Sequence, residues 1–416
     1  MSNVRIKEKT LFAYIAMTFS FMGGCSIFQG NVGTLQWGLF YYGSVIMMLL
    51  LSIYYIFTNR NTKVSRKRNY YIILFCAPRV IMLIYSCVIW IITNTAFPYI
   101  SRGISNTLFQ CIAYFCGVCF ACGEKDDILK ITLASSITVF SLAYIIGFME
   151  NGVKFIYALN PFSSYAYEYS KYTELHELAY IIGLYLLVHL IIKKNTSLKK
   201  ENTLFWLSLI VFFIAWKRIG IFALILVYIL YLFLSKIKCF NKAFCIRIIG
   251  IIGIVACICY VSLIVSGTFV KVLQSFGINF MGRDIIYNYF RKFADFSVGF
   301  IGKGVGFVTR QFDYATRDDL YNMVSIKAIH NDFFKIYIEI GFVGFVIWLI
   351  WWLVKIPKIL CKKCGVEKAF ICFMFILYAF ILYTTDNAES YTNFQLQLSA
   401  LITYIACFYT KEENDL

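Results

Sequence analysis

Charged residues, prolines and histidines are all scarce in this chain of 416 residues. Only 15% of the residues are charged and 60% are apolar, which argues against a soluble globular protein. Four prolines and no visible internal repeat give little sign of the broken, repeated helices that are typical of transporters. Only three histidines are available for proton transfer, so each of them is informative.

Apolar segments long enough to cross a bilayer recur along the chain and predict an all-α membrane protein with about twelve transmembrane helices. The predicted spans are 11–28, 37–57, 71–93, 106–122, 131–148, 178–192, 203–216, 219–235, 248–266, 334–354, 369–384 and 393–408. We interpret residues 1–416 as one polytopic domain, in which 267–333 form a large extracytoplasmic loop containing amphipathic helices.

The net charge of +17 would suggest nucleic acid in a soluble domain, but the positive-inside rule explains most of it here. With the N-terminus inside, the inner connections hold 24 Lys and Arg and the outer ones 13, eight of them in the long loop. Both termini are therefore predicted to be cytoplasmic.

None of the fifteen cysteines falls in a predicted outer loop, which excludes an outward disulfide framework.

His330 is the strongest candidate for chemistry, because it lies where the long polar loop enters another apolar helix. An imidazole can accept a proton from a hydroxyl near neutral pH, and Asn331 or Asp332 could cap the helix that follows. The same position also suits a solvated loop histidine.

His176, beside Glu174 and Glu177, is a rival base, whereas His189 within an apolar span is expected to be packed and neutral.

Cations in the predicted outer segments could bind an anion. Lys217 and Arg218 occupy a tight junction between two spans, and Arg283 and Arg291 are eight residues apart in the long loop with Tyr287 between them. A guanidinium group matches phosphate oxygens, although anchoring to lipid phosphates is the common alternative for each of them.

Gly302–Gly306 lacks the ending of a phosphate-binding loop and predicts a tight turn. Charges within membrane spans are costly and by default indicate function. Within the predicted spans, Lys335 and Glu339 are one helical turn apart and are expected to pair, while Arg79 has no partner nearby in the sequence.

The many spans, the late outer loop, and His330-Asn331 followed by Glu339-Ile340-Gly341-Phe342-Val343-Gly344 resemble the O-antigen polymerase and ligase superfamily. At the level of motifs the resemblance covers roughly residues 203–345. Lys217-Arg218-Ile219-Gly220 looks like the family's Ser-Arg-Gly junction, with Lys in place of Ser and Ile inserted before Gly. Gly282-Arg283 looks like the arginine that opens the helix of the large loop.

The resemblance implies a membrane glycosyltransferase of the bacterial inner membrane in surface polysaccharide (lipopolysaccharide) biosynthesis. Its substrate would be an undecaprenyl-pyrophosphate-linked oligosaccharide. Arg218 and Arg283, with Lys217 and Arg291, would bind the donor's pyrophosphate, and His330 would activate the acceptor hydroxyl. Membrane lipid is an expected partner, as is a chain-length regulator protein; nucleic acid, a cofactor and a metal are not expected.

Three functions stay open at this point. The first is a polymerase that transfers a growing glycan to the next lipid-linked repeat unit. The second is a ligase that passes the finished chain to a lipid-anchored core. A flippase for lipid-linked oligosaccharides is the alternative from another class.

Overall fold

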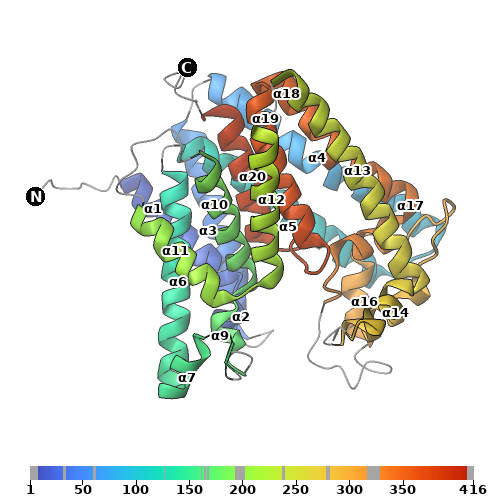
Figure 1. Ribbon diagram of the computed structural model, residues 1–416, viewed down its shortest axis with the longest axis horizontal. Coiled ribbons are helices and arrows are strands. Elements are labelled where there is room, and N and C mark those ends of the chain that lie inside the picture. Colours follow the sequence, from blue (N-terminus) through green and yellow to red (C-terminus); the bar gives the residue numbers. More distant parts are fainter. Residues whose placement is uncertain are drawn as a thin grey trace, which may run out of the picture. The chain divides into compact units, whose positions relative to one another are not determined.

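The computed structural model describes residues 8–30, 34–59, 62–125, 127–160, 162–163, 165, 168–192, 202–236, 239–277, 282–315 and 328–409 (Figure 1). Within these ranges the regular structure is entirely helical. The predicted all-α class is therefore confirmed.

The chain forms two compact units. Unit 1 contains Met1–Ile72, Ile112–Lys236 and Tyr391–Leu416, and unit 2 contains Ile73–Cys111 and Ile237–Ser390. The helices α4 (Thr62–Ile92) and α5 (Phe97–Gly123) each have residues in both units.

Unit 1 is built around one helix that is buried on every side. The helix α10 (His176–Ile192) packs against four other helices of the unit, and Leu178 to Val188 are almost fully buried. An unbroken apolar sequence suits this position, because no face of the helix meets solvent. The other helices of unit 1 are α1 (Glu8–Gly23), α2 (Ser26–Gln29), α3 (Leu35–Thr58), α6 (Ile128–Asn151), α7 (Val153–Ala158), α9 (Ser170–Thr173), α11 (Asn202–Ala215), α12 (Arg218–Ser235) and α20 (Thr392–Cys407).

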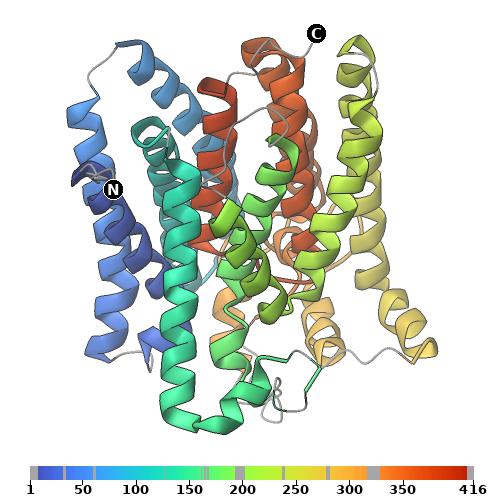
Figure 2. The ribbon, with the colours of Figure 1, turned by 60° about the vertical axis from the view of Figure 1, so that its left-hand side comes forward.

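Unit 2 combines long apolar helices with the described parts of the predicted loop. Its long elements are α13 (Cys239–Ser266), α17 (Asp332–Ile350), the π-helical turn η4 (Trp351–Lys355), α18 (Ile356–Cys364) and α19 (Val366–Tyr383). The loop contributes α14 (Thr268–Ser275), α15 (Arg283–Phe290), the 3-10 turn η2 (Arg291–Phe293) and α16 (Phe307–Ala315). Figure 2 shows α14 following the C-terminal end of α13.

The helices of the loop pack onto protein rather than lying free. The side chains of Ile286, Tyr287 and Phe290 on α15 are buried in an apolar cluster with residues of α13, α16 and α17. The expected helical spacing after Arg283 is present, and the apolar face is covered by the unit itself.

In the part of the chain that the structure describes, eight helices are long and apolar enough to cross a membrane, so the chain is a multi-pass membrane protein. They lie within 35–58, 63–92, 97–123, 128–151, 218–235, 242–266, 332–364 and 366–383. The other four predicted spans fall on α1, α10, α11 and α20, which have 16, 17, 14 and 16 residues. The count of twelve stays a prediction.

The glycine-rich segment from Gly302 to Gly306 is a tight turn locked against a kink in α17. Gly302, Gly304 and Gly306 all have positive φ, as does Gly341 at the kink. The N–H groups of Lys303 and Gly304 donate to the carbonyls of Ile338 and Glu339 (2.9 and 2.7 Å), which the kink leaves without helical partners.

The same segment also uses its remaining donors inside the protein. The N–H groups of Gly306 and Val308 donate to one carboxylate oxygen of Glu339 (3.0 and 3.3 Å), and the N–H of Val305 donates to Ser86 Oγ (3.0 Å). These donors bind the protein, so the turn expected from the sequence is confirmed and a phosphate cradle is not formed.

Gly341→Ala should destabilise the protein strongly. The new Cβ would force a side chain into a left-handed backbone conformation, at a cost of about 1–2 kcal/mol, and would collide with Phe300 O and Gly302 N. Gly152→Ala is the matched control, because Gly152 also has positive φ but open space around it. Thermal unfolding in detergent should show a larger decrease in Tm for Gly341→Ala than for Gly152→Ala. Equal decreases would show that the packing at the kink contributes nothing to stability.

Candidate functional site: an imidazole held over a buried charge network

His330 lies directly before α17 in a backbone conformation that is unusual for its type. Its φ is +49°, in the left-handed region. Its side chain is 25% exposed, so part of the ring is open to the outside of unit 2. Such a conformation costs free energy and persists only where neighbouring contacts hold it.

The segment between α19 and α20 supplies contacts that hold His330. The backbone N–H of His330 donates to Asn387 Oδ1 (3.1 Å), and Asn387 Nδ2 lies 3.3 Å from His330 Nδ1. Asp386 Oδ1 lies 3.6 Å from the same ring nitrogen. An unprotonated Nδ1 can accept from Asn387 Nδ2, whereas a proton on Nδ1 faces the buried carboxylate of Asp386; in that second tautomer Nε2 is the nitrogen that can accept a proton.

Asn331 caps α17 and connects it with two tyrosines. Its Oδ1 accepts from the N–H of Phe334 (3.0 Å), which confirms the predicted capping role. Its Nδ2 donates to the hydroxyl oxygens of Tyr260 and Tyr287 (2.9 and 3.4 Å). The Tyr260 hydroxyl donates in turn to the carbonyl of Thr384 (2.6 Å). The start of α17 is thus tied to α13, α15 and the end of α19.

Arg283 opens α15 and acts electrostatically on this network. The residue is partly buried, and its positive charge influences Tyr287 one turn further along the helix. Burial raises the pKa of the Tyr287 phenol, while the hydrogen bond from Asn331 and the charge of Arg283 oppose that rise. Tyr287 therefore stays protonated and can donate to the carbonyl of His330 (3.4 Å). Arg283 and His330 belong to the same connected part of unit 2.

Arg291 has a different environment from Arg283. The helix α15 ends at Phe290, and Arg291 begins the 3-10 turn that follows. Its Nε donates to the carbonyl of Val265 (2.8 Å) and its Nη1 to Asn288 Oδ1 (3.1 Å). These contacts fix the turn against the end of α13, so much of this guanidinium is used within the protein.

Lys217 and Arg218 lie in unit 1. Lys217 Nζ binds Glu174 Oε2 (2.6 Å) and lies 3.1 Å from His176 Nε2. Arg218 is the exposed first residue of α12. The rival base His176 therefore contacts Lys217, one of the predicted anion-binding cations. His189, as expected, is buried and stacks on Phe205, with 4.2 Å between ring centroids.

Unit 2 also contains a group of largely buried charged side chains that contact one another. Arg79 of α4 forms an ion pair with Glu389, and both side chains are less than a tenth exposed. Lys335 Nζ lies 3.9 Å from the other oxygen of Glu389 and donates to Ser390 Oγ (2.6 Å). The N–H of Glu389 donates to Asp332 Oδ2 (2.7 Å). Glu389 therefore contacts two cations from different helices, and Lys335 also attracts the buried carboxyl groups of Asp332 and Glu339.

This arrangement corrects the expectation that Lys335 and Glu339 pair with each other. Lys335 is directed to Glu389 and Ser390, and Glu339 accepts backbone N–H groups from the glycine-rich turn. One helical turn of spacing permits a pair, but the kink at Gly341 gives Glu339 nearer donors. Arg79, which had no partner nearby in the sequence, finds Glu389 through tertiary structure.

Sequence reasoning missed Asp386, Asn387 and Glu389. The available signal was a cluster of polar and acidic residues in the short connection 385–392 between two predicted spans. Short connections normally carry turn residues, and nothing local indicates that these side chains point into the protein.

The fold and this buried polar network define a multi-pass helical membrane protein with a histidine site at one end of unit 2. Residues 203–349 match the model of a family described as O-antigen ligase. The resemblance to the O-antigen polymerase and ligase superfamily is thereby confirmed over this segment, which includes Lys217, Arg218, Arg283, Arg291 and His330. Among curated proteins, none matches the chain.

Glu389→Gln should destabilise the protein because it removes the carboxylate that pairs with the buried guanidinium of Arg79. Loss of one partner of a buried pair costs about 3–5 kcal/mol, which should appear as a large drop in Tm. Arg79→Gln combined with Glu389→Gln should recover part of that loss. Lys130→Gln, which removes the exposed pair with Asp127 (3.5 Å), is the control and should cost less than about 1 kcal/mol. Strictly additive losses would contradict the pairing of Arg79 with Glu389.

Proposed function

We propose that this protein is a membrane glycosyltransferase that polymerises a surface polysaccharide. It would transfer a growing glycan from undecaprenyl pyrophosphate to the next lipid-linked repeat unit. The family match over 203–349 supports an enzyme of the O-antigen ligase and polymerase type. The observation that carries the catalytic part is the imidazole of His330, held between Asp386 and Asn387 with one face of the site open.

In the proposed step an acceptor hydroxyl oxygen attacks the anomeric carbon of the donor sugar. A carbon–oxygen bond forms, the bond to the pyrophosphate oxygen breaks, and undecaprenyl pyrophosphate leaves. The hydroxyl proton moves to Nε2 of His330, and Asp386 stabilises the imidazolium at Nδ1. Asn331 and Asn387 act as positioning residues, because they fix the backbone on either side of this contact.

Binding of the leaving group is assigned to four cations, Arg283, Arg291, Lys217 and Arg218. Arg283 is the best supported, since it shares a connected network with His330 and its charge is available. A fixed guanidinium stabilises the charge that develops on a departing pyrophosphate. For Lys217 and Arg218 the assignment rests on the family resemblance. Arg291 would bind the pyrophosphate only through the part of its guanidinium group that does not donate to Val265 or Asn288.

Two alternatives differ in acceptor or in chemistry. A ligase would use the same donor and the same base but a lipid-anchored core as acceptor, and the match to a family described as O-antigen ligase supports it. A flippase would move the lipid-linked unit without breaking a bond, and it would have no need of an oriented imidazole.

One reconstitution separates the three functions. The purified protein in nanodiscs receives a lipid-linked repeat unit, with or without a lipid-anchored core. Longer chains from the repeat unit alone support the polymerase, whereas a product that requires the core supports the ligase. In sealed vesicles, movement of intact units across the bilayer without any new glycosidic bond would reject both enzymes.

His330→Ala should lower kcat by roughly 10²- to 10⁴-fold, the range expected for loss of a general base. Asp386→Asn keeps the shape of the side chain and should lower kcat roughly 10- to 100-fold with little change in KM, because the imidazolium loses its counter-charge. Chain growth in nanodiscs measures both. Loss of activity in His176→Ala with full activity in His330→Ala would assign the base to the rival histidine.

Arg283→Gln should raise KM for the lipid-linked donor and lower kcat, and Arg283→Lys should restore part of the loss because it restores the charge without the planar fork. Lys271→Gln is the matched control, since Lys271 is an exposed cation on α14 of the same loop. Equal changes in KM and kcat for Arg283→Gln and Lys271→Gln would show that Arg283 only attracts anions in general.

A further inference from the structure

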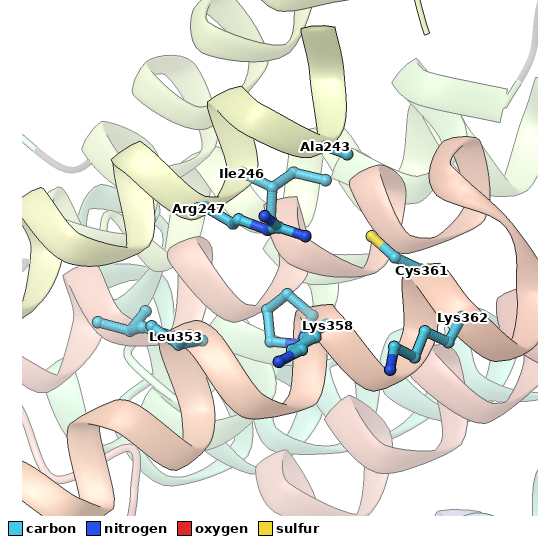
Figure 3. A pocket seen from close by; sticks show the side chains of 9 residues that line it. Ala243, Ile246, Arg247, Leu353, Lys358, Cys361 and Lys362 are labelled. Atoms are coloured by element: carbon cyan, nitrogen blue, oxygen red, sulfur yellow. The ribbon is translucent and has the colours of Figure 1, made fainter. Parts of the chain in front are cut away.

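A cavity of about 60 Å³ lies between α13 and the helix formed by η4 and α18 (Figure 3). It exceeds the roughly 10–15 Å³ that a single water needs. Three cations border it, Arg247 from α13 and Lys358 and Lys362 from α18. The other lining residues are Ala243, Ile246, Leu353, Val354, Pro357 and Cys361.

The sequence creates this cavity through local backbone features. Gly250 brings α13 so close to the carbonyl of Leu353 that a Cβ would collide with it. Leu353 belongs to the π-helical turn η4, and Pro357 follows one helical turn later. The two helices therefore touch at Gly250 and leave space beside Ala243 and Arg247.

The charged side chains that line the cavity are all positive. None of its nine lining residues is acidic, and all three of its cations are exposed. The nearby acid Glu367 forms an ion pair with Lys242 (2.7 Å). The cavity thus has an apolar wall and a positive rim, which suits a phosphate ester attached to an apolar group.

The cavity is distant from the histidine site. Ile264 of α13 shares an apolar cluster with Ile329, next to His330, and lies 17 residues from Arg247, about 25 Å along the axis of this continuous helix. This is close to the roughly 30 Å thickness of a bilayer's hydrocarbon core. The cavity therefore lies at the opposite membrane boundary from His330, on the side that the charge rule predicts to be cytoplasmic.

We propose that this cavity binds the phosphate head group of an anionic phospholipid of the opposite leaflet. A lipid is favoured over free phosphate because exposed apolar side chains continue from the cavity along α13, at Ile251, Ile252 and Val255 (54–60% exposed). An acyl chain can lie along this stripe while the head group meets Arg247, Lys358 and Lys362.

The test uses the full-length protein in nanodiscs of phosphatidylcholine with increasing phosphatidylglycerol. Native mass spectrometry measures how much phosphatidylglycerol the released protein retains. Each of Arg247→Gln, Lys358→Gln and Lys362→Gln should weaken retention about fivefold, the effect of roughly one surface cation. Lys355→Gln is the matched control, because Lys355 is an exposed cation of the same helix that does not line the cavity.

A second variant separates the cavity from simple attraction of anionic lipid to basic residues. Ala243→Leu fills the cavity and keeps all three cations, so it should also abolish retention while Tm in pure phosphatidylcholine stays unchanged. Full retention by Ala243→Leu, or an equal effect of Lys355→Gln, would overturn the proposal. Displacement of phosphatidylglycerol by equimolar inorganic phosphate would assign the site to free phosphate and overturn the lipid.

Discussion

The buried carboxylate of Glu389 is the constraint on which the histidine site of unit 2 depends. It contacts Arg79 and Lys335 where water is largely excluded, so its removal takes away the carboxylate that pairs with the buried guanidinium of Arg79. This network fixes the segment between α19 and α20 against α4 and α17. The same segment carries Asp386 and Asn387, which hold His330 in its left-handed conformation. The catalytic geometry proposed for His330 therefore depends on charges that never touch a substrate.

The helix α17, continued by η4 and α18, has three special points with different chemistry. At its start, Asn331 satisfies the helix end and two tyrosines at once. In its middle, the kink at Gly341 exposes carbonyls that the glycine-rich turn pairs. At its far end, the π-helical turn and Pro357 form one wall of the basic cavity. Each irregularity occurs where backbone groups find partners within the protein, as a low-dielectric surrounding requires.

Glycosyl transfer explains these features better than transport does. A base must be oriented toward an acceptor, and the contacts of His330 from Asp386 and Asn387 provide such orientation. A leaving pyrophosphate needs fixed positive charge, which is the role proposed for Arg283 beside Tyr287. The choice between polymerase and ligase depends on the acceptor, which neither the polar network nor the family match identifies.

The sequence by itself determined the all-α membrane class, the cap at Asn331, the tight turn at Gly302–Gly306 and the family resemblance around His330. These features depend on local composition or on residues a few positions apart. Tertiary structure alone decided the partners of Arg79, Lys335, Glu339 and His330, because Glu389 and Asp386 are distant from them in the sequence. Which charges pair in a membrane protein depends on which helices pack together. The local sequence of an apolar helix does not indicate which other helices will be its neighbours.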